Sequence, residues 1–464
     1  MDTCTRLACF KAYDIRGRVP ETLSAPLAFA LGMALADVLG VQGAVVGRDA
    51  RLSGPALRDG LVAGLQRRGV VVADMGMCGT EEIYHATARH DWDVGIMITG
   101  SHNPADENGF KLVRRGAIPV SADSGLNTLH ERVAELLRPS PPPLPAPAAV
   151  QTVSYRGEYA RWLANHADLG AGTPPLKILA DAGNGCAGLV LRELAPLLPC
   201  TLVLRHAEPD GTFPHGVPNP LLPERRAATA QAVRETGADM GLAWDGDFDR
   251  CFFYDAAGQF IEGYYLVGLL AQELLRTHPG GTIIHDPRLY WNTRDVVGAA
   301  GGVPVMGKTG HAFIKERMRT EDAIYGGEMS AHHYFRDFAY CDSGMLPWLL
   351  VASLVRRTGR PLAALVTERM AAYPCSGEIN RRVNDAPALM HRVREVYGPM
   401  ATHEDSIDGI NLEFPNWRFN LRMSNTEPLI RLNVESRGDA ALMREKTAEL
   451  LRFLEQHGDA RPTR

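Results

Sequence analysis

Three times along this chain, an apolar stretch typical of a buried strand stops abruptly in a polar loop. The loops cover residues 99–108, 245–250 and 326–333. Between them, short apolar runs alternate with amphipathic stretches, which is typical of βαβ units and a mainly parallel sheet. Because ligands bind beyond the carboxyl ends of strands in open α/β sheets, we expect one binding loop in each of three α/β domains. The predicted strands are residues 44–46, 70–72, 95–98, 177–180, 240–244, 282–284 and 323–325, and residues 55–67 are a predicted helix.

The chain is divided by a run of prolines at residues 139–147, which excludes helix and predicts an extended linker. A length of 464 residues is too great for one hydrophobic core and predicts three or four domains. The last segment differs from the rest. Residues 417–422 and 429–434 alternate with period two around a turn, and a helix is predicted over 440–454. This pattern favours a smaller α+β domain.

Composition narrows the class of protein. The net charge of -5 argues against a nucleic-acid partner. No apolar run reaches the ~18 residues of a membrane helix, and the N-terminal segment is too short for a signal peptide. The eight cysteines are scattered without a C-x-x-C pair, which is typical of a reduced protein rather than a disulfide framework or a zinc site. We therefore expect a cytoplasmic protein with neither nucleic acid nor membrane as a partner.

The second loop is acidic, with Asp245, Asp247 and Asp249 at alternate positions. Three such carboxylates repel one another unless a cation lies between them. An EF-hand is excluded, because Arg250 and Ala256 stand where it needs Gly and Glu. Oxygen-only ligands after a buried strand favour Mg²⁺, with a solvated acidic turn as the alternative.

The first loop places Ser101 directly after a predicted strand, with Gly100 before it. A serine hydrolase elbow is excluded, because Thr99 and Asn103 occupy the two glycine positions. A serine can instead carry a phosphoryl group, whose charge needs a metal and hydrogen-bond donors around it. Lys111 is a candidate proton shuttle if its surroundings lower its pKa. A capped surface turn is the alternative for this loop alone.

The third loop carries Glu328 and Ser330 after two glycines, and these side chains suit the hydroxyls of a sugar. His332 and His333 are adjacent, so their side chains point apart and do not favour a shared zinc ion.

A fourth loop, in the last segment, combines hydroxyl side chains with arginines. Such a set favours a phosphate site, with a polar hairpin as the alternative. Its residues are Arg422, Ser424, Asn425, Thr426 and, on the following strand, Arg431.

Together and in this order, the four loops resemble those of the α-D-phosphohexomutase superfamily, over essentially the whole chain. The signatures are residues 12–17, 99–104, 245–250, 327–330 and 422–428. Residues 308–315 and 326–335 are most similar to bacterial phosphomannomutases of GDP-mannose and exopolysaccharide synthesis. The resemblance implies an α/β fold of four domains around a central cleft, the first three with a shared mixed α/β/α sheet core and the fourth a smaller α+β domain. The predicted domains are 1–148 with the phosphoserine loop, 149–254 with the metal-binding loop, 255–372 for sugar recognition and 373–464 with the phosphate clamp.

The resemblance also implies a role for each loop. Ser101 carries the phosphoryl group, and one Mg²⁺ per chain is bound by that phosphate and by the three aspartates of the acidic loop (Asp245, Asp247 and Asp249). Lys111 and His332 match positions implicated in general acid/base catalysis. Arg250 matches a cleft-lining position and is expected to be one of the catalytic residues.

The remaining matches concern the substrate. Glu328 and Ser330 match residues that hold sugar hydroxyls. Arg288 stands where some relatives with dual mannose and glucose activity carry Lys. The clamp for the non-reacting phosphate is Arg422, Ser424, Asn425, Thr426 and Arg431, and further substrate-contacting or cleft-lining positions are Tyr13, Arg16 and His311.

The implied reaction is the reversible conversion of mannose 6-phosphate and mannose 1-phosphate through phospho-Ser101 and a bound hexose 1,6-bisphosphate. The product would supply GDP-mannose and surface polysaccharide synthesis. One alternative is a phosphoglucomutase or a dual-specificity enzyme. Two others are a metal-dependent phosphatase, which needs no distal clamp, and a phosphosugar-binding protein, which needs no nucleophile. The expected partners are small-molecule hexose phosphates, and the expected state is a monomer, with a dimer as the alternative.

Overall fold

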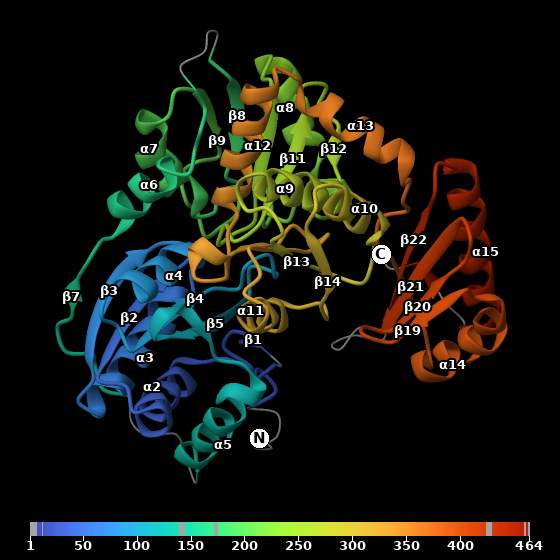
Figure 1. Cartoon of the computed structure of the whole chain (residues 1–464). Helices are drawn as coiled ribbons and strands as arrows, with labels where there is room; N and C mark the ends of the chain where they lie inside the picture. The colour runs from blue at the N-terminus through green and yellow to red at the C-terminus, as the bar shows by residue number, and fades with distance from the viewer. Residues whose placement is uncertain are drawn as a thin grey trace. The chain divides into compact units, whose positions relative to one another are not determined.

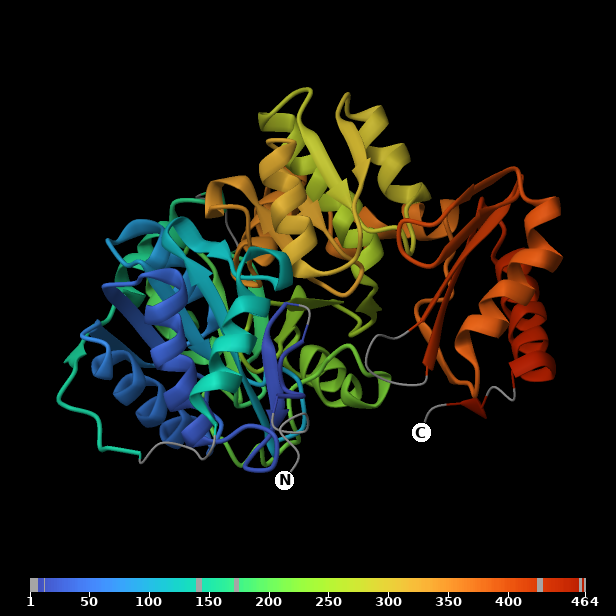
Figure 2. The same ribbon diagram turned by 90° about the horizontal axis from the view of Figure 1, so that it is seen from below.

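The structure of the chain is a computed structural model that describes residues 7–11, 13–138, 144–170, 175–423, 429–458 and 461–462 (Figures 1 and 2). It divides into two compact units. Unit 1 is Met1–Phe260 with His332–Gly359, and unit 2 is Ile261–Ala331 with Arg360–Arg464. The domain bounds expected at residues 148, 254 and 372 stay predictions.

Unit 1 begins with a mixed sheet of strand order β1-β5-β4-β2-β3-β7, in which β6 also pairs with β5. The central strands β2, β3 and β4 are parallel, and β5 is antiparallel to β4 and β1. Its strands are β1 (Ile15–Arg18), β2 (Gly43–Arg48), β3 (Val71–Met77), β4 (Val94–Ile98), β5 (Glu107–Arg114), β6 (Ile118–Pro119) and β7 (Gln151–Thr152). Its helices are α2 (Ala25–Leu39), α3 (Gly54–Arg67), α4 (Thr80–Arg89) and α5 (Leu126–Leu136).

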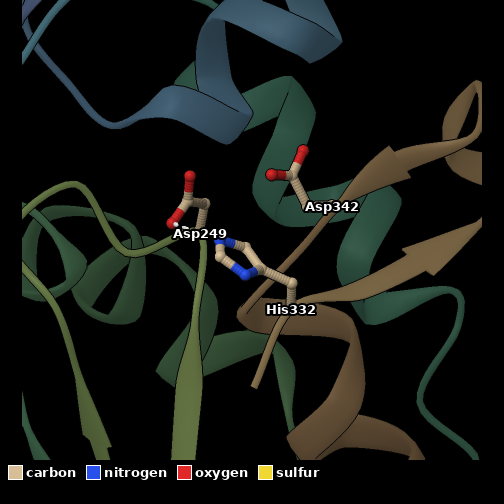
Figure 3. Close-up of side chains that lie close together, drawn as sticks. All are labelled: Asp249, His332 and Asp342. Carbon is tan, nitrogen blue, oxygen red and sulfur yellow. Dashed lines mark ion pairs between the residues drawn. The ribbon is translucent and has the colours of Figure 1, made fainter. Parts of the chain in front are cut away.

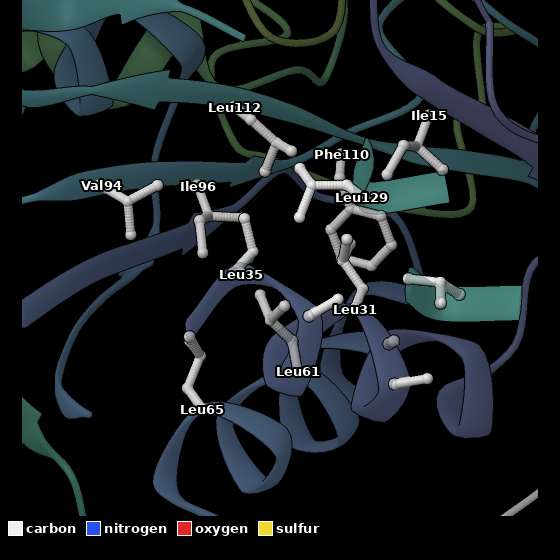
Figure 4. Packing of buried hydrophobic residues seen from close by; sticks show 14 of the residues in the cluster. Ile15, Leu31, Leu35, Leu61, Leu65, Val94, Ile96, Phe110, Leu112 and Leu129 are labelled. Carbon is white, nitrogen blue, oxygen red and sulfur yellow. The ribbon is translucent and has the colours of Figure 1, made fainter. Parts of the chain in front are cut away.

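The core of this first domain lies between one face of the sheet and the helices α2, α3 and α5 (Figure 4). Leu31 and Leu35 of α2 are fully buried there, as is Ile96 of β4. Side chains alternate along a strand, so Gly95 faces the opposite side, where a Cβ would meet Thr87 and Ile83 of α4. The sheet is therefore covered on both faces, and its binding loops are confined to the strand ends.

Two glycines set the spacing of α2 and α3. A Cβ on Gly64 would lie 2.0 Å from the carbonyl oxygen of Phe29, and one on Gly32 would lie 2.3 Å from that of Leu61. Both distances are far inside van der Waals contact. The two helices therefore pack backbone to backbone, which only residues without a side chain allow.

The rest of unit 1 contains a second sheet and the segment His332–Gly359. In the second sheet, β10 is parallel to β8 and antiparallel to β11, and β9 is parallel to β8. Its strands are β8 (Lys177–Asp181), β9 (Thr201–Arg205), β10 (Met240–Trp244) and β11 (Cys251–Asp255), with β12 (Phe260–Ile261) at the edge of the unit. The helices are α6 (Arg156–Ala164), α7 (Ala187–Leu194) and α8 (Ala227–Thr236), and the later segment holds β16 (His333–Phe335), β17 (Cys341–Asp342) and α12 (Met345–Thr358).

Unit 2 contains three parallel strands, in which β13 pairs with both β14 and β15. They are β13 (Thr282–His285), β14 (Val303–Met306) and β15 (Tyr325–Gly327), with α9 (Gly263–Thr277), α10 (Trp291–Ala299), α11 (His311–Thr320) and α13 (Leu362–Ala372). The strand expected at residues 323–325 therefore begins two residues later than predicted. The polar segment after it is correspondingly shorter, since β16 already begins at His333.

The last part of unit 2 is an antiparallel sheet of order β19-β20-β21-β22-β18-β23. Its elements are β18 (Ile379–Arg382), α14 (Ala386–Tyr397), β19 (His403–Asp405), β20 (Ile410–Glu413), β21 (Trp417–Met423), β22 (Leu429–Ser436), α15 (Ala440–Gly458) and β23 (Arg461–Pro462). The predicted hairpin and terminal helix are confirmed, and so is the predicted class of a mixed-sheet α/β fold with a smaller α+β domain at the end.

Short 3-10 turns are η1 (Arg115–Ala117), η2 (Ala122–Ser124), η3 (Ala195–Leu197), η4 (Pro223–Arg225), η5 (Arg336–Phe338) and η6 (Gly398–Met400). None of the seven cysteines within the described residues forms a disulfide. In that same part of the chain, no helix combines the length and the apolar character needed to cross a bilayer.

Candidate active site

Ser101 lies in the loop between β4 and β5, where β4 ends at Ile98. Its backbone has a φ of 50°, a left-handed conformation that is uncommon for a residue with a side chain. The Thr99 hydroxyl accepts a 2.8 Å hydrogen bond from the Ser101 amide. The Ser101 hydroxyl donates a 2.7 Å hydrogen bond to Asp245 Oδ2. The loop therefore presents the buried serine directly to the acidic loop.

Arg51 fixes the backbone of the Ser101 loop through hydrogen bonds. Its two terminal nitrogens donate hydrogen bonds of 2.5 to 2.9 Å to four carbonyl oxygens, those of Ser101, Asn103, Pro104 and Glu107. The guanidinium is fully buried, and Asp49 lies 3.3 Å from its Nε. Asp49 also accepts a hydrogen bond from the Thr99 hydroxyl at 2.7 Å. A strained serine persists where its surroundings over-determine the backbone, and these two residues supply that constraint.

The acidic loop follows β10, as predicted, and its three aspartates are almost completely buried. One carboxylate oxygen from each of Asp245, Asp247 and Asp249 lies within 4.8 Å of the other two. The Oδ1 atoms of Asp247 and Asp249 are buried and have no hydrogen-bond partner among the described residues. Such oxygens are costly without a cation, so the three aspartates fit a hard metal ion.

Lys111 projects from β5 into the same cluster. Its ammonium donates a 2.7 Å hydrogen bond to Asp247 Oδ2 and a shorter one to Asp249 Oδ2. Burial favours the neutral amine, but the two carboxylates outweigh it, and the pKa of Lys111 is raised above its ordinary value. The lowered pKa that a proton shuttle would need is not found here, because the aspartates lie within hydrogen-bond distance. With these two contacts, Lys111 brings a positive charge to the acidic loop.

The pKa values of the aspartates move in opposite directions. Burial opposes ionisation of Asp247, but Lys111 outweighs burial and the pKa of Asp247 is lowered. Burial and the neighbouring charge of Asp247 raise the pKa of Asp249. The hydroxyl of Thr80 donates a 2.5 Å hydrogen bond to Asp247 Oδ2, which adds to the stabilisation of that anion.

Two arginines add positive charge around Ser101. Arg250 donates hydrogen bonds to Asp245 Oδ2 from Nε at 3.0 Å and Nη2 at 2.7 Å, and its Nη2 lies 3.4 Å from Ser101 Oγ. Arg16 lies on β1 and donates a 3.0 Å hydrogen bond to the side chain of Asn103 in the serine loop. The positive charge of Arg250 and Arg16 suits a phosphoryl group carried at Ser101.

Tyr13 is half-buried just before β1.

His332 approaches the acidic loop from the segment just before β16. Its Nε2 lies 4.0 Å from Asp249 Oδ1, and the imidazole is one-fifth exposed. Asp342 of β17 joins these two residues, and ligand atoms of all three lie within 4.8 Å of one another (Figure 3). His333, by contrast, is fully buried, and burial lowers its pKa to about 3. The two adjacent histidines thus have different environments, as predicted.

A second group of predicted residues lies in unit 2, around Arg288. One of its terminal nitrogens donates to Asp286 at 2.8 Å and lies 3.4 Å from Glu328 and 3.3 Å from the Ser330 hydroxyl. Glu328 also accepts a 3.1 Å hydrogen bond from the Gly310 amide, directly before His311 at the start of α11. The structure therefore brings the predicted sugar-binding residues together, with Arg288 at their centre.

Arg422 and Arg431 lie opposite each other on β21 and β22. Both donate to the carboxylate of Glu378, at 2.9 Å from Arg422 and 3.1 Å from Arg431. The other members of the predicted clamp, Ser424, Asn425 and Thr426, lie outside the described residues.

Several residues at these sites were not predicted from the sequence: Asp49, Arg51, Thr80, Asp286, Asp342 and Glu378. Asp49 and Arg51 had a usable signal, because they follow a predicted strand end just as Ser101 does. The others are single polar residues whose neighbours in the sequence carry no motif. Their proximity to the sites arises only from folding.

Comparison with known proteins identifies the family. Models of the four domains of the phosphoglucomutase/phosphomannomutase family match the chain in order. Alpha/beta/alpha domain I matches residues 8–136, domain II 158–258, domain III 262–373 and the C-terminal domain 378–452.

Individual relatives agree. An Escherichia coli protein named phosphomannomutase is 55% identical over 456 residues, which cover 97% of this chain and 100% of that protein. A Xanthomonas campestris protein named "Phosphohexose mutases" is 55% identical over 448 residues, 97% of this chain and 99% of its own. A crystal structure of a phosphoglucomutase/phosphomannomutase family protein from Burkholderia thailandensis has a TM-score of 0.85 at 32% identity over 97% of both chains. The chain is therefore an enzyme of the phosphoglucomutase/phosphomannomutase family, an isomerase of the α-D-phosphohexomutase superfamily.

Proposed function

We propose that this phosphohexomutase interconverts mannose 6-phosphate and mannose 1-phosphate, with Ser101 carrying the phosphoryl group between them. The observation that carries the proposal is the 2.7 Å hydrogen bond from the Ser101 hydroxyl to Asp245, inside a buried cluster of acidic and basic side chains. A surface turn would not place a serine there. High identity to proteins named phosphomannomutase supports mannose as the sugar.

In the proposed reaction, the bond between phosphorus and Ser101 Oγ breaks as a bond forms to O1 or O6 of the sugar. The hydroxyl proton of the sugar passes to a base, and His332 suits this role better than Lys111. Lys111 is held as a cation by two carboxylates, whereas the His332 imidazole is partly exposed beside Asp249. Lys111, Arg16 and Arg250 instead offset the negative charge of the transferred group.

Asp245, Asp247 and Asp249, together with the phosphate on Ser101, would hold one Mg²⁺ ion. When bound, this ion would supply further positive charge to the transferring phosphoryl group. Asp245 has a second task, because it orients both the Ser101 hydroxyl and Arg250.

The first transfer yields a bound hexose 1,6-bisphosphate, whose other phosphate is returned to Ser101. Glu328 and Ser330 are proposed to hold the sugar hydroxyls, with Arg288, Tyr13 and His311 as further contacts. Arg422 and Arg431, together with Ser424–Thr426, are proposed to hold whichever phosphate is not reacting. That clamp must therefore accept the phosphate at either end of the intermediate.

The pathway and setting are part of the same proposal. We place the enzyme in the cytoplasm as a monomer that supplies GDP-mannose and surface polysaccharide synthesis, on the resemblance of its loops to those of bacterial phosphomannomutases. Activity on glucose phosphates is the second candidate. It is favoured by the relatives from Xanthomonas campestris, whose name covers phosphohexoses in general. Rates on mannose 1-phosphate and glucose 1-phosphate, measured side by side, decide between the two.

Ser101→Ala tests the central role. The variant, supplied with hexose 1,6-bisphosphate, is expected to lose nearly all mutase turnover, and mass spectrometry should find one phosphate on Ser101 of the unaltered enzyme. Ser154→Ala, at an exposed position, is the matched control and should retain full activity. Turnover of the Ser101→Ala variant at the level of the control would contradict the proposal.

A further inference from the structure

We propose that Glu378 is a built-in counter-charge of the phosphate clamp, which limits the affinity of the clamp so that it releases one phosphate and accepts the other in every turnover. This inference rests on the proposed function of Arg422 and Arg431. It assigns a role in substrate release to a residue outside the loops identified from the sequence.

Glu378 lies directly before β18, the strand that pairs with β22. Its Oε2 accepts a 2.9 Å hydrogen bond from Arg422, and its Oε1 accepts one of 3.1 Å from Arg431. Arg288 is the third cation around this carboxylate, with its Nη1 3.7 Å from Oε2. One carboxylate thus connects the clamp arginines with the arginine that contacts Glu328 and Ser330.

The charges of this group favour a role in anion binding. Arg422 and Arg431 stand directly opposite each other across β21 and β22, where like charges repel. Arg288 already has Asp286 at 2.8 Å. Asp408 lies 3.9 Å from Nη1 of Arg422, but Glu378 is the carboxylate that accepts hydrogen bonds from both clamp arginines. The pair carries two positive charges, and Glu378 offsets one of them through its direct hydrogen bonds. A phosphate monoester brings about −1.5 to −2 at neutral pH.

The charge on Glu378 is permanent under working conditions. Burial would raise the pKa of this carboxyl, but Arg422, Arg288 and Arg431 outweigh burial and lower it to about 2. The Glu378 side chain is 17% exposed, and the Nε atoms of Arg422 and Arg431 have no hydrogen-bond partner among the described residues. Donors therefore remain for a phosphate while Glu378 stays in place.

A limited affinity suits a mutase. Tight binding of the non-reacting phosphate that is equal in the ground state and the transition state lowers KM without raising kcat. In this reaction, tight binding of that phosphate also delays the step in which the bisphosphate turns over, so that its other phosphate faces Ser101. A clamp with a full double positive charge would therefore hold substrate more tightly and turn over more slowly.

Glu378→Gln is the test, since it keeps the shape and removes the charge. We expect KM for mannose 1-phosphate to fall about tenfold and kcat to fall by a similar factor. The same substitution is then made in a Ser101→Ala background, where no phosphoryl transfer occurs. Calorimetric titration should show that the double variant binds mannose 1-phosphate and inorganic phosphate about tenfold more tightly than Ser101→Ala alone. A purely structural role predicts the opposite, weaker binding, because the arginines lose their orientation. An unchanged or weaker affinity for both probes would overturn the proposal.

Two further variants complete the design. Glu404→Gln removes one charge from the same domain at a carboxylate paired with Arg394, and it should leave both affinities unchanged. Glu378→Asp retains the charge and should keep the affinity within about threefold of the unaltered protein, even where Gln is not tolerated. A large gain in affinity with Asp would contradict a role for the charge. If the proposed function is wrong, the unaltered protein will show no mutase turnover. The ratio of phosphate affinities between the double variant and Ser101→Ala alone still tests Glu378 in that case.

Discussion

The guanidinium of Arg51 donates a 2.9 Å hydrogen bond to the carbonyl oxygen of Ser101, and three more to the residues that follow. Four of its N–H groups therefore hold a single loop. These four bonds reach backbone oxygens, whereas the Ser101 hydroxyl interacts with Asp245. Arg51 is thus a positioning residue, and its effect on the reaction is carried by the backbone.

Arg51→Met should lower kcat at least about 100-fold, because displacing a reacting group by about 1 Å has effects of that size. KM for the hexose phosphate should change less than about threefold, since the proposed clamp residues are untouched. Steady-state kinetics together with phosphate content at Ser101 check this. Arg58→Met is the control, as Arg58 of α3 pairs with Asp74 and Asp59. A KM increase that accounts for the whole loss would show that Arg51 acts on binding instead.

Lys111→Met should make thermal stability depend more strongly on Mg²⁺. Without the ammonium, Asp247 and Asp249 face each other as buried carboxylates, which a cation relieves. The rise in Tm on replacing EDTA by Mg²⁺ should exceed that of the unaltered protein by at least about 2 °C. Differential scanning calorimetry measures it, with Lys177→Met as the control. Equal responses of both proteins to Mg²⁺ would mean that the aspartates are not the metal site.

Acid should destabilise the protein through His85. Burial lowers the pKa of this histidine from 6.5 to about 4, so the unfolded chain takes up the proton first as the pH falls. The stabilisation is complete above pH 6.5 and is lost progressively towards pH 4, by at most about 3 kcal/mol. His85→Gln should flatten the dependence of unfolding free energy on pH in this window. The exposed His391→Gln should not, and identical profiles for the two variants would rule out His85 as a source of acid sensitivity.

Gly64→Ala should destabilise unit 1 by about 1 to 3 kcal/mol, because the new methyl group meets the carbonyl oxygen of Phe29 at 2.0 Å. Gly298 of α10 offers the matched control, since a Cβ there meets nothing within 4 Å. Gly298→Ala should stabilise by about 0.5 to 1 kcal/mol through its helix propensity. Urea unfolding of both variants checks the pair. Equal effects would mean that helix propensity, and not the close approach of α2 and α3, decides the cost at Gly64.

Much of the fold was predictable from local patterns. The strand predicted at residues 240–244 is β10, and the helix predicted at 55–67 is α3 with one added residue. These patterns are reliable because burial of one helix face or both strand faces imposes a period on the sequence itself. The strand expected at 323–325 was misplaced by two residues, because Gly326 and Gly327 continue β15 although glycine disfavours strands.

The site was predictable in part. Ser101 and the three aspartates lie in loops that follow strand ends, and the resemblance of the four loops to a known superfamily implied that they are partners. It could not predict the state of Lys111, since a pKa depends on which charges lie within a few ångströms and not on the residue type. The two aspartates shift that pKa upwards, opposite to the direction that a proton shuttle would need.

The sequence by itself determined the class of fold, the family, and the loops that carry the proposed reactive side chains, because these follow from periodicity and from contiguous motifs. Tertiary structure alone decided which charges meet. It placed Arg51 beneath the Ser101 loop, Asp342 beside His332, and Glu378 between Arg422 and Arg431, although these partners lie apart in the sequence. The reason is physical. Hydrogen bonds and ion pairs act over a few ångströms, and only the packing of the folded chain brings such distant residues within that range.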